Sequence, residues 1–531
     1  MPPYPCLQSL PAMNGSLPAL PHPTVPAPDA AGHASEESGG GLVGYLILFL
    51  PYGVASALAS LPLASYLVAW AGSVLILWLT LSGRVRPMPG GRSAFDQVMR
   101  PIVLTQVLFA GYSFLSSVFY VADINGFYYL SRVTTSVVPG AMDVAAQAQR
   151  YYVLAHAAVA TGMLVAMDYR RSGEWAVRPL QNPALTTLRI SLVCVVISGL
   201  LGGSSQIGIR IGQIGLVASV LSLGLAIPTR RPGVLLLGLG IYGLNMMSAF
   251  LSGWKEEVLV MVLLLAVFVY PYARRTVLIG APVVLTLLLA FLPTYVDIIR
   301  GLSWEGTTAS DEAASIAVDE ITSGDLDMSA KNWHFLTGRI SEIGMFVVYI
   351  TAVEATNPSD PNGGYYGTQI LRQAVMGLIP RPFWEDKPVT EEIVMERAYA
   401  ANVVSEHSEV SAKPQYVVDG YLSWGAPGVF LSGLAFGLIA AWSSRACERW
   451  FGGYFWGSGL VYTAMFAVLW KGNSFEFFFN TVLWSFVLLV PLFWIGRMRG
   501  LLIHSERLED VQELAEVTPH VASRRRHWAV T

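Results

Sequence analysis

Apolar residues along the chain form a series of long runs separated by short polar connections. From Gly41 onward these runs contain roughly 17–23 residues, enough at about 1.5 Å per residue to cross a hydrocarbon layer of about 30 Å. The pattern predicts an all-α polytopic membrane protein with about twelve transmembrane helices. We place these helices at residues 42–60, 64–82, 101–122, 151–168, 190–206, 211–228, 233–252, 257–272, 276–297, 426–443, 454–470 and 475–496.

One long polar segment interrupts this series late in the chain. It divides the sequence into a tail at 1–40, nine helices at 41–299, a large external loop at 300–424, three helices at 425–496 and a tail at 497–531. The first tail is rich in Pro, Ala, Gly and Ser and contains no Lys or Arg, so we expect it to be disordered.

Within the large loop, two stretches have helical periodicity. Residues 335–354 predict a helix that lies on the membrane or is partly inserted, and residues 366–378 predict a short amphipathic helix. The Pro- and Gly-rich sequence at 357–364 separates them as a turn. The acidic run at 311–327 is expected to be flexible and solvated.

The distribution of basic residues predicts the orientation. If the N-terminus is cytoplasmic, the short inner connections contain fourteen arginines, whereas the short outer connections contain only five basic residues. Inner connections of membrane proteins carry an excess of Lys and Arg, so both termini are expected inside and the large loop outside.

Composition excludes several functional classes. With 53% hydrophobic and 13% charged residues, the chain is too apolar for an ordinary soluble protein. The net charge of −3 gives no basis for nucleic-acid binding. The sequence has no phosphate-binding loop and no dinucleotide fingerprint, and its histidines and cysteines lack metal-ligand spacing. We therefore expect neither a cofactor nor a metal.

Four motifs give the chain a family resemblance: residues 252–256 before a helix, Arg339–Ser341, the sequence IPRPFWEDKP at 379–388, and GYLSWGAPG at 420–428. Together they resemble the Wzy-type bacterial oligosaccharide repeat-unit polymerases of the O-antigen polymerase and ligase group. The resemblance covers residues 253–499, and the proline-rich motif is its most specific part.

The resemblance implies a nucleotide-independent glycosyltransferase. It would polymerise oligosaccharide repeat units carried on undecaprenyl or another polyprenyl pyrophosphate, during surface or exopolysaccharide synthesis. One alternative is an O-antigen-type ligase that moves the glycan to another acceptor. Another is a transporter or flippase for lipid-linked oligosaccharides, although transporters usually carry charges near mid-membrane, whereas Lys255, Asp297 and Glu476 fall near predicted outer ends. A third alternative is a sensor that binds a glycan without turnover.

Such a reaction needs cations for the departing diphosphate, a base near the acceptor hydroxyl and aromatic faces for sugar rings. The candidate bases are Glu305, Glu342 and His334. Arginine binds phosphate oxygens through its planar fork, and Arg339 and Arg381 lie in the family motifs. The full set of candidate substrate-binding residues is Lys255, Arg300, Arg339, Arg372, Arg381, Trp384, Lys387 and Tyr421.

The expected partners follow from this reaction. They are the polyprenyl-pyrophosphate-linked oligosaccharide, the membrane lipid bilayer, a chain-length regulator and a flippase, with no nucleic acid. The expected location is the cytoplasmic (inner) membrane.

Overall fold

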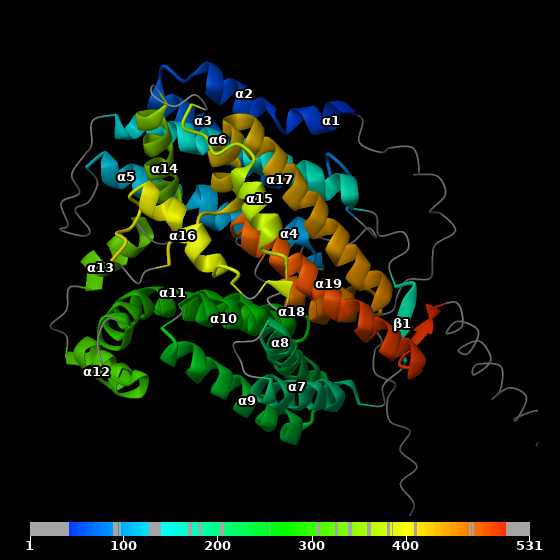
Figure 1. Cartoon of the computed structure of the whole chain (residues 1–531). Helices are drawn as coiled ribbons and strands as arrows, with labels where there is room; N and C mark the ends of the chain where they lie inside the picture. The colour runs from blue at the N-terminus through cyan, green and yellow to red at the C-terminus, as the bar shows by residue number, and fades with distance from the viewer. Residues whose placement is uncertain are drawn as a thin grey trace, which may run out of the picture.

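The computed structural model describes the chain as a bundle of helices (Figure 1). It describes residues 42–505 except 89–93, 95–96, 127–139, 168–172, 179–181, 202–205, 254, 305–307, 324–327, 338–341, 358–362, 380–382, 385, 408–410, 467–468 and 470–471. The predicted disordered tail at 1–40 and most of the tail at 497–531 therefore lie outside the described residues.

Helices account for nearly all of the described elements. In the first half of the chain they are α1 (Leu42–Ile47), α2 (Leu50–Ala57), α3 (Pro62–Leu81), α4 (Pro101–Phe109), η4 (Ala110–Leu115), α5 (Ser117–Ile124), α6 (Ala141–Ala166), α7 (Pro183–Leu200), α8 (Gln206–Thr229), α9 (Pro232–Leu251) and α10 (Lys255–Val269). In the second half they are α11 (Arg274–Ile299), η5 (Arg300–Trp304), α12 (Ser310–Ser323), α13 (Met328–Phe335), α14 (Ile343–Thr356), α15 (Gln369–Met376), α16 (Thr390–Ala400), α17 (Tyr416–Trp450), η8 (Tyr454–Tyr462), α18 (Thr463–Phe466) and α19 (Phe475–Met498).

Eight helical segments of the described chain are long and apolar enough to cross a membrane. They are Pro62–Leu81, Pro101–Ile124, Pro183–Leu200, Ile207–Thr229, Pro232–Leu251, Arg274–Ser303, Tyr416–Trp450 and Phe475–Met498. The other four predicted spans coincide with shorter or more polar helices: α1 with α2, α6, α10, and η8 with α18. The all-α multi-pass fold agrees with the prediction, while length and hydropathy support eight of the twelve expected crossings.

The centre of the bundle is the contact between α6 and α17. The two helices approach so closely that a Cβ added to Gly437 would lie 2.2 Å from the carbonyl oxygen of Val159, and one added to Gly162 would lie 2.4 Å from that of Leu434. The α6 face in this contact is rich in buried alanines. Small residues allow membrane helices to pack backbone against backbone, which gives close van der Waals contact.

Helix α17 begins earlier than the predicted span at 426–443 and contains a break. Trp424 and Gly425 have non-helical backbone angles, and Gly425 has a φ of +63°. The segment before the break folds back on the segment after it, because a Cβ added to Gly428 would lie 1.9 Å from the carbonyl oxygen of Gly420. Pro427 then stands at the start of the long continuous part, where its missing N–H costs nothing.

A two-stranded ladder defines one end of the bundle. Strand β1 (Trp175–Val177), which follows α6, pairs antiparallel with β2 (Leu502–His504), which follows α19. The C-terminal ends of α6 and α19 therefore lie together, as the predicted alternation of spans requires. We call this end of the bundle the ladder end and the opposite end the loop end; at about 1.5 Å per residue the 24 residues of α19 separate them by roughly 36 Å.

The large loop folds into the short helices α12 to α16 (Figure 1). Helix α14 matches the stretch predicted at 335–354, and it packs against α6 and α17 with Phe346 and Ile350 fully buried. Helix α15 matches the stretch predicted at 366–378. The acidic run is not a flexible segment throughout: residues 310–323 form α12, because Ala313 and Ala317 are one turn apart and are buried in the contact with α11.

We expect Gly437→Ala to destabilise the protein by roughly 1–3 kcal/mol, because its Cβ would collide with the α6 backbone. Gly240→Ala is the matched control: Gly240 is also helical, and an added Cβ would meet nothing within 4 Å. Thermal unfolding of purified protein in detergent measures the effect. Equal unfolding temperatures for the two variants would contradict the close packing of α6 and α17.

Candidate functional site

Arg397 is the most deeply buried cation at the loop end among the described residues. It lies on α16 beside the buried side chains of Val394 and Ala398, and only 3% of its surface is exposed. An arginine on the apolar face of a helix needs partners there, because an unpaired buried charge is strongly destabilising.

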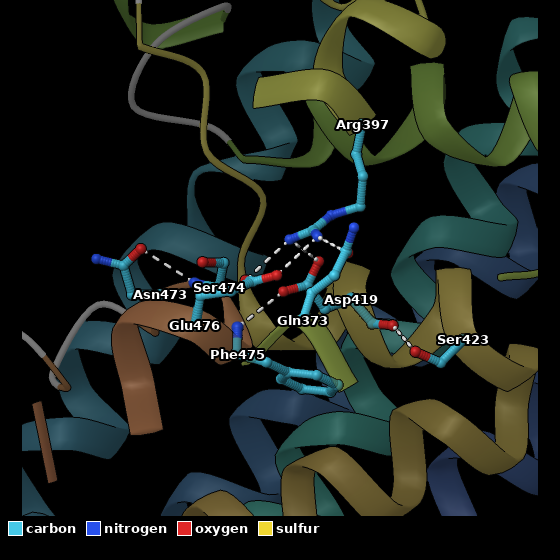
Figure 2. A network of polar contacts seen from close by, with 8 residues as sticks. All are labelled: Gln373, Arg397, Asp419, Ser423, Asn473, Ser474, Phe475 and Glu476. Carbon is cyan, nitrogen blue, oxygen red and sulfur yellow. Dashed lines mark hydrogen bonds and ion pairs between the residues drawn. The ribbon is translucent and has the colours of Figure 1, made fainter. Parts of the chain in front are cut away.

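Two carboxylates from different helices surround this guanidinium (Figure 2). Arg397 Nη1 donates to Glu476 Oε1 at 2.8 Å and Nη2 donates to Glu476 Oε2 at 3.0 Å, which is the bidentate geometry that makes an Arg–carboxylate pair strong. Nη2 also lies 3.2 Å from Asp419 Oδ1. Glu476 opens α19 and Asp419 lies in the folded-back start of α17, so one side chain joins three helices.

Further hydrogen bonds complete the network. The backbone N–H of Phe475 donates to Asp419 Oδ2 at 2.8 Å, so this carboxylate caps the first turn of α19. Gln373 Oε1, from α15, accepts from Arg397 Nη1 at 3.3 Å. We call Gln373, Arg397, Asp419 and Glu476 the Arg397 cluster.

The charges of the Arg397 cluster do not cancel when every group is ionised, because one guanidinium faces two carboxylates. Both carboxylates are fully buried. Burial lowers the pKa of Arg397, but the charges of Asp419 and Glu476, together with the hydrogen bonds that Arg397 donates to Glu476, raise this pKa by more. The net shift is therefore upward, and the guanidinium stays charged. The cluster therefore fixes α15 and α16 of the large loop onto α17 and α19.

A second buried ion pair lies near the ladder end. Arg100, at the start of α4, donates from Nε and Nη2 to the two oxygens of Glu448, each at 2.8 Å. Ser458 Oγ donates to the same carboxylate at 2.6 Å, and Gln97 accepts from Arg100. This pair lies near the C-terminal end of α17 and binds that helix to α4 and η8.

Two of the predicted substrate-binding cations make contacts that are structural. Lys387 Nζ donates to the carbonyl oxygens of Gly377 and Ile379, the latter at 2.9 Å. These hydrogen bonds satisfy carbonyl groups at the C-terminal end of α15. Arg300 Nε donates to the carbonyl oxygen of Gly253 at 3.2 Å, just after α9. That contact brings Arg300 close to the start of α10, where Lys255 stands, although the side chain of Lys255 lies outside the description.

The aromatic candidates differ in accessibility. Tyr421 is buried in a cluster with Tyr151, Phe346 and Tyr365, at ring-centroid distances of 5.0, 5.5 and 5.8 Å. It does not offer a free face to a sugar ring. Trp384 is half-buried, and the neighbouring Phe383 is 83% exposed.

The other candidates that the structure describes lie on separate elements. Arg372 is exposed on α15 and His334 is exposed at the end of α13. Glu342 is half-buried just before α14, where its N–H donates to the carbonyl oxygen of Tyr112. Glu305, Arg339 and Arg381 lie outside the described residues. In the described part of the chain, no group of three His, Cys, Asp or Glu side chains is arranged to hold a metal ion.

Sequence reasoning missed the Arg397 cluster because its members are far apart in the chain. Each of the three charged members carries a local signal: Arg397 follows Val394 at helical spacing on the apolar side of α16, Asp419 interrupts an apolar stretch, and Glu476 opens a transmembrane run. Charges at positions expected to be buried require partners. Pairing these three would have identified the cluster.

We expect Arg397→Met to destabilise the protein by about 3–5 kcal/mol, because it leaves two buried carboxylates without a cation. Arg372→Met, on the exposed face of the adjacent helix, is the control and should change stability little. Adding Asp419→Asn and Glu476→Gln to Arg397→Met should restore much of the loss. Thermal unfolding in detergent tests this, and an unaffected Arg397→Met variant would show that the cluster contributes no stability.

Comparison with known proteins adds one assignment. A family model described as Domain of unknown function (DUF8712) matches residues 50–504. No curated protein and no solved structure matches the chain. The match begins in α2, ends in β2 and includes every member of the Arg397 cluster. The chain therefore belongs to the DUF8712 family.

Proposed function

We propose that the protein is a membrane glycosyltransferase that polymerises polyprenyl-pyrophosphate-linked oligosaccharide repeat units at the outer face of the cytoplasmic membrane. The main support is the combination of a motif and its setting. The proline-rich motif at 379–388 lies between α15 and α16, and the Arg397 cluster fixes both of these helices to the membrane helices α17 and α19.

The setting of the motif suits a substrate at the membrane surface. Lys387, near the end of the motif in sequence, donates to the carbonyl oxygens of Gly377 and Ile379 at the end of α15. Phe383 and Trp384 of the motif offer accessible aromatic surface, and Arg381 stands two positions before Phe383 in the sequence. Aromatic faces stack on sugar rings, and guanidinium groups bind diphosphate oxygens.

The proposed reaction requires no nucleotide. The acceptor hydroxyl oxygen attacks the anomeric carbon of the donor glycan, the bond from that carbon to the pyrophosphate oxygen breaks, and the electron pair leaves with the lipid pyrophosphate. A base takes the hydroxyl proton; Glu305, Glu342 and His334 are its candidates. Arg381 and Arg339 would stabilise the negative charge on the departing diphosphate.

The rival enzymatic function is ligation of the finished glycan to another acceptor, and transport of the lipid-linked unit is the non-enzymatic rival. The three predict different products in a strain that lacks the gene. Loss of long chains with single repeats still present supports polymerisation. Long chains that are absent from their final carrier would indicate ligation, and repeat units retained on the inner face would indicate transport.

We expect Arg381→Ala to reduce chain extension at least about a hundredfold, because a charge-assisted contact to the leaving group contributes roughly 3–4 kcal/mol to the transition state. Lys413→Ala is the matched control, since Lys413 is an external cation paired with Glu391 at 3.1 Å and is not part of the motif. Gel sizing of the polysaccharide, with immunoblotting for inserted protein, measures both. Normal chain lengths in the Arg381→Ala strain would remove this residue from the site.

A further inference from the structure

The exposed side chains of α15 change from polar to apolar along one stripe of the helix. At its beginning, the stripe consists of the polar residues Thr368, Gln369 and Arg372. At helical spacing further along, Val375 is 54% exposed, Met376 47% and Ile379 41%, and Phe383 beyond them is 83% exposed. The opposite side of α15 is buried, and the helix packs against α19 (Figure 1). Contiguous exposed apolar side chains mark a surface that contacts another molecule.

The beginning of α17 gives a scale of depth for α15. The folded-back segment of α17 runs antiparallel to the long part of the same helix. Tyr416 stacks on Phe436 with ring centroids 4.2 Å apart, and Gly420 lies against Gly428, nearer the break. The long part runs from the break toward the ladder end. The order from Ser423 back to Tyr416 is therefore the order from the loop end into the bundle.

Helix α15 runs obliquely along this scale, toward the interior of the bundle. Just before the helix, the N–H of Tyr366 donates to the carbonyl oxygen of Leu422 at 2.9 Å. Seven residues later, Gln373 belongs to the Arg397 cluster together with Asp419, which precedes Leu422 by three residues. Three residues of a helix rise about 4.5 Å. The end of α15 therefore lies deeper than its beginning.

The Arg397 cluster marks the hydrocarbon boundary at the loop end. Glu476 is the second residue of α19, whose 24 residues span about 36 Å, whereas the hydrocarbon layer is about 30 Å thick. Centred on the bilayer, α19 extends roughly 3 Å beyond this layer at each end, which places Glu476 at its edge. Met376 and Ile379 follow Gln373 along the oblique helix and so lie below that edge. The change from polar to apolar side chains on α15 thus coincides with the boundary of the hydrocarbon.

The backbone at the end of α15 also suits an apolar setting. Carbonyl and N–H groups need partners within the protein wherever lipid surrounds them. Lys387 Nζ donates to the carbonyl oxygens of Gly377 and Ile379, the latter at 2.9 Å. Pro380 and Pro382, which follow in the sequence, have no N–H that would need an acceptor.

We propose that the apolar end of α15, with Phe383, inserts into the acyl chains of the leaflet at the loop end. Bilayer lipid fits this surface better than a second copy of the chain does. A specific protein interface buries roughly 800 Å² on each partner and involves about 20–30 residues a side, far more than these few side chains. The inference does not depend on the proposed function, because it concerns the bilayer and not the glycan.

The test is the accessibility of spin labels on the full chain in lipid nanodiscs, with the native Cys6, Cys194 and Cys447 replaced by alanine. Molecular oxygen reaches labels among acyl chains, whereas a water-soluble nickel chelate reaches labels in water. The test position is Met376→Cys. The matched control is Gln369→Cys, which is exposed on the same stripe two turns earlier. Val487→Cys, 48% exposed along the membrane helix α19, gives the value for a label among lipids.

We expect the Met376 label to shift to the accessibility of the Val487 label, with more collisions with oxygen than with the chelate. The Gln369 label should show the reverse. A Met376 label that the chelate reaches as readily as it reaches the Gln369 label overturns the proposal. A Met376 label that neither reagent reaches also overturns it, because protein, such as a second copy, would then cover the surface.

A second position covers the case in which Met376→Cys does not fold. Phe383→Cys should also be reached by oxygen in preference to the chelate, since Phe383 belongs to the same surface. If the label on a folded Phe383→Cys protein behaves like the Gln369 label, the proposed insertion is wrong.

Discussion

The attachment of α15 and α16 to the membrane helices α17 and α19 depends on one buried guanidinium. Arg397 brings together two acidic side chains that would otherwise repel each other, and each acid belongs to a different membrane helix. In an interior of low dielectric constant such an arrangement forms only when all its members are present in the correct geometry. It therefore specifies where α16 sits more strictly than apolar packing alone does.

The buried charges differ between the two ends of the bundle. Near the ladder end Arg100 pairs with Glu448, and Arg86 and Arg445 donate to the last carbonyl oxygens of α6, where the helix dipole favours cations. At the loop end, by contrast, two carboxylates share the one guanidinium of the Arg397 cluster.

The sequence was sufficient to predict the helical membrane fold, because the length of an apolar run determines whether it can span a bilayer. Helices α14 and α15 were also predicted from periodicity. The helical state of α12 was not predicted, because the acidic composition of the segment indicated a solvated loop. The two alanines that pack on α11, Ala313 and Ala317, are too short a pattern to outweigh it. The Arg397 cluster could not be predicted by local reasoning, since Arg397 and Glu476 are 79 positions apart and only the packing of α16 against α19 makes them neighbours.

The ladder between β1 and β2 has a consequence for biogenesis. Trp175 and His504 are paired in this ladder. The second strand is synthesised only after every other described element. Glu476 likewise arrives with the last described helix. Until that helix enters the bilayer, Arg397 lacks the Glu476 carboxylate and β1 lacks its partner strand. Completion of the bundle therefore waits for α19 and β2, the last of the described elements to be synthesised.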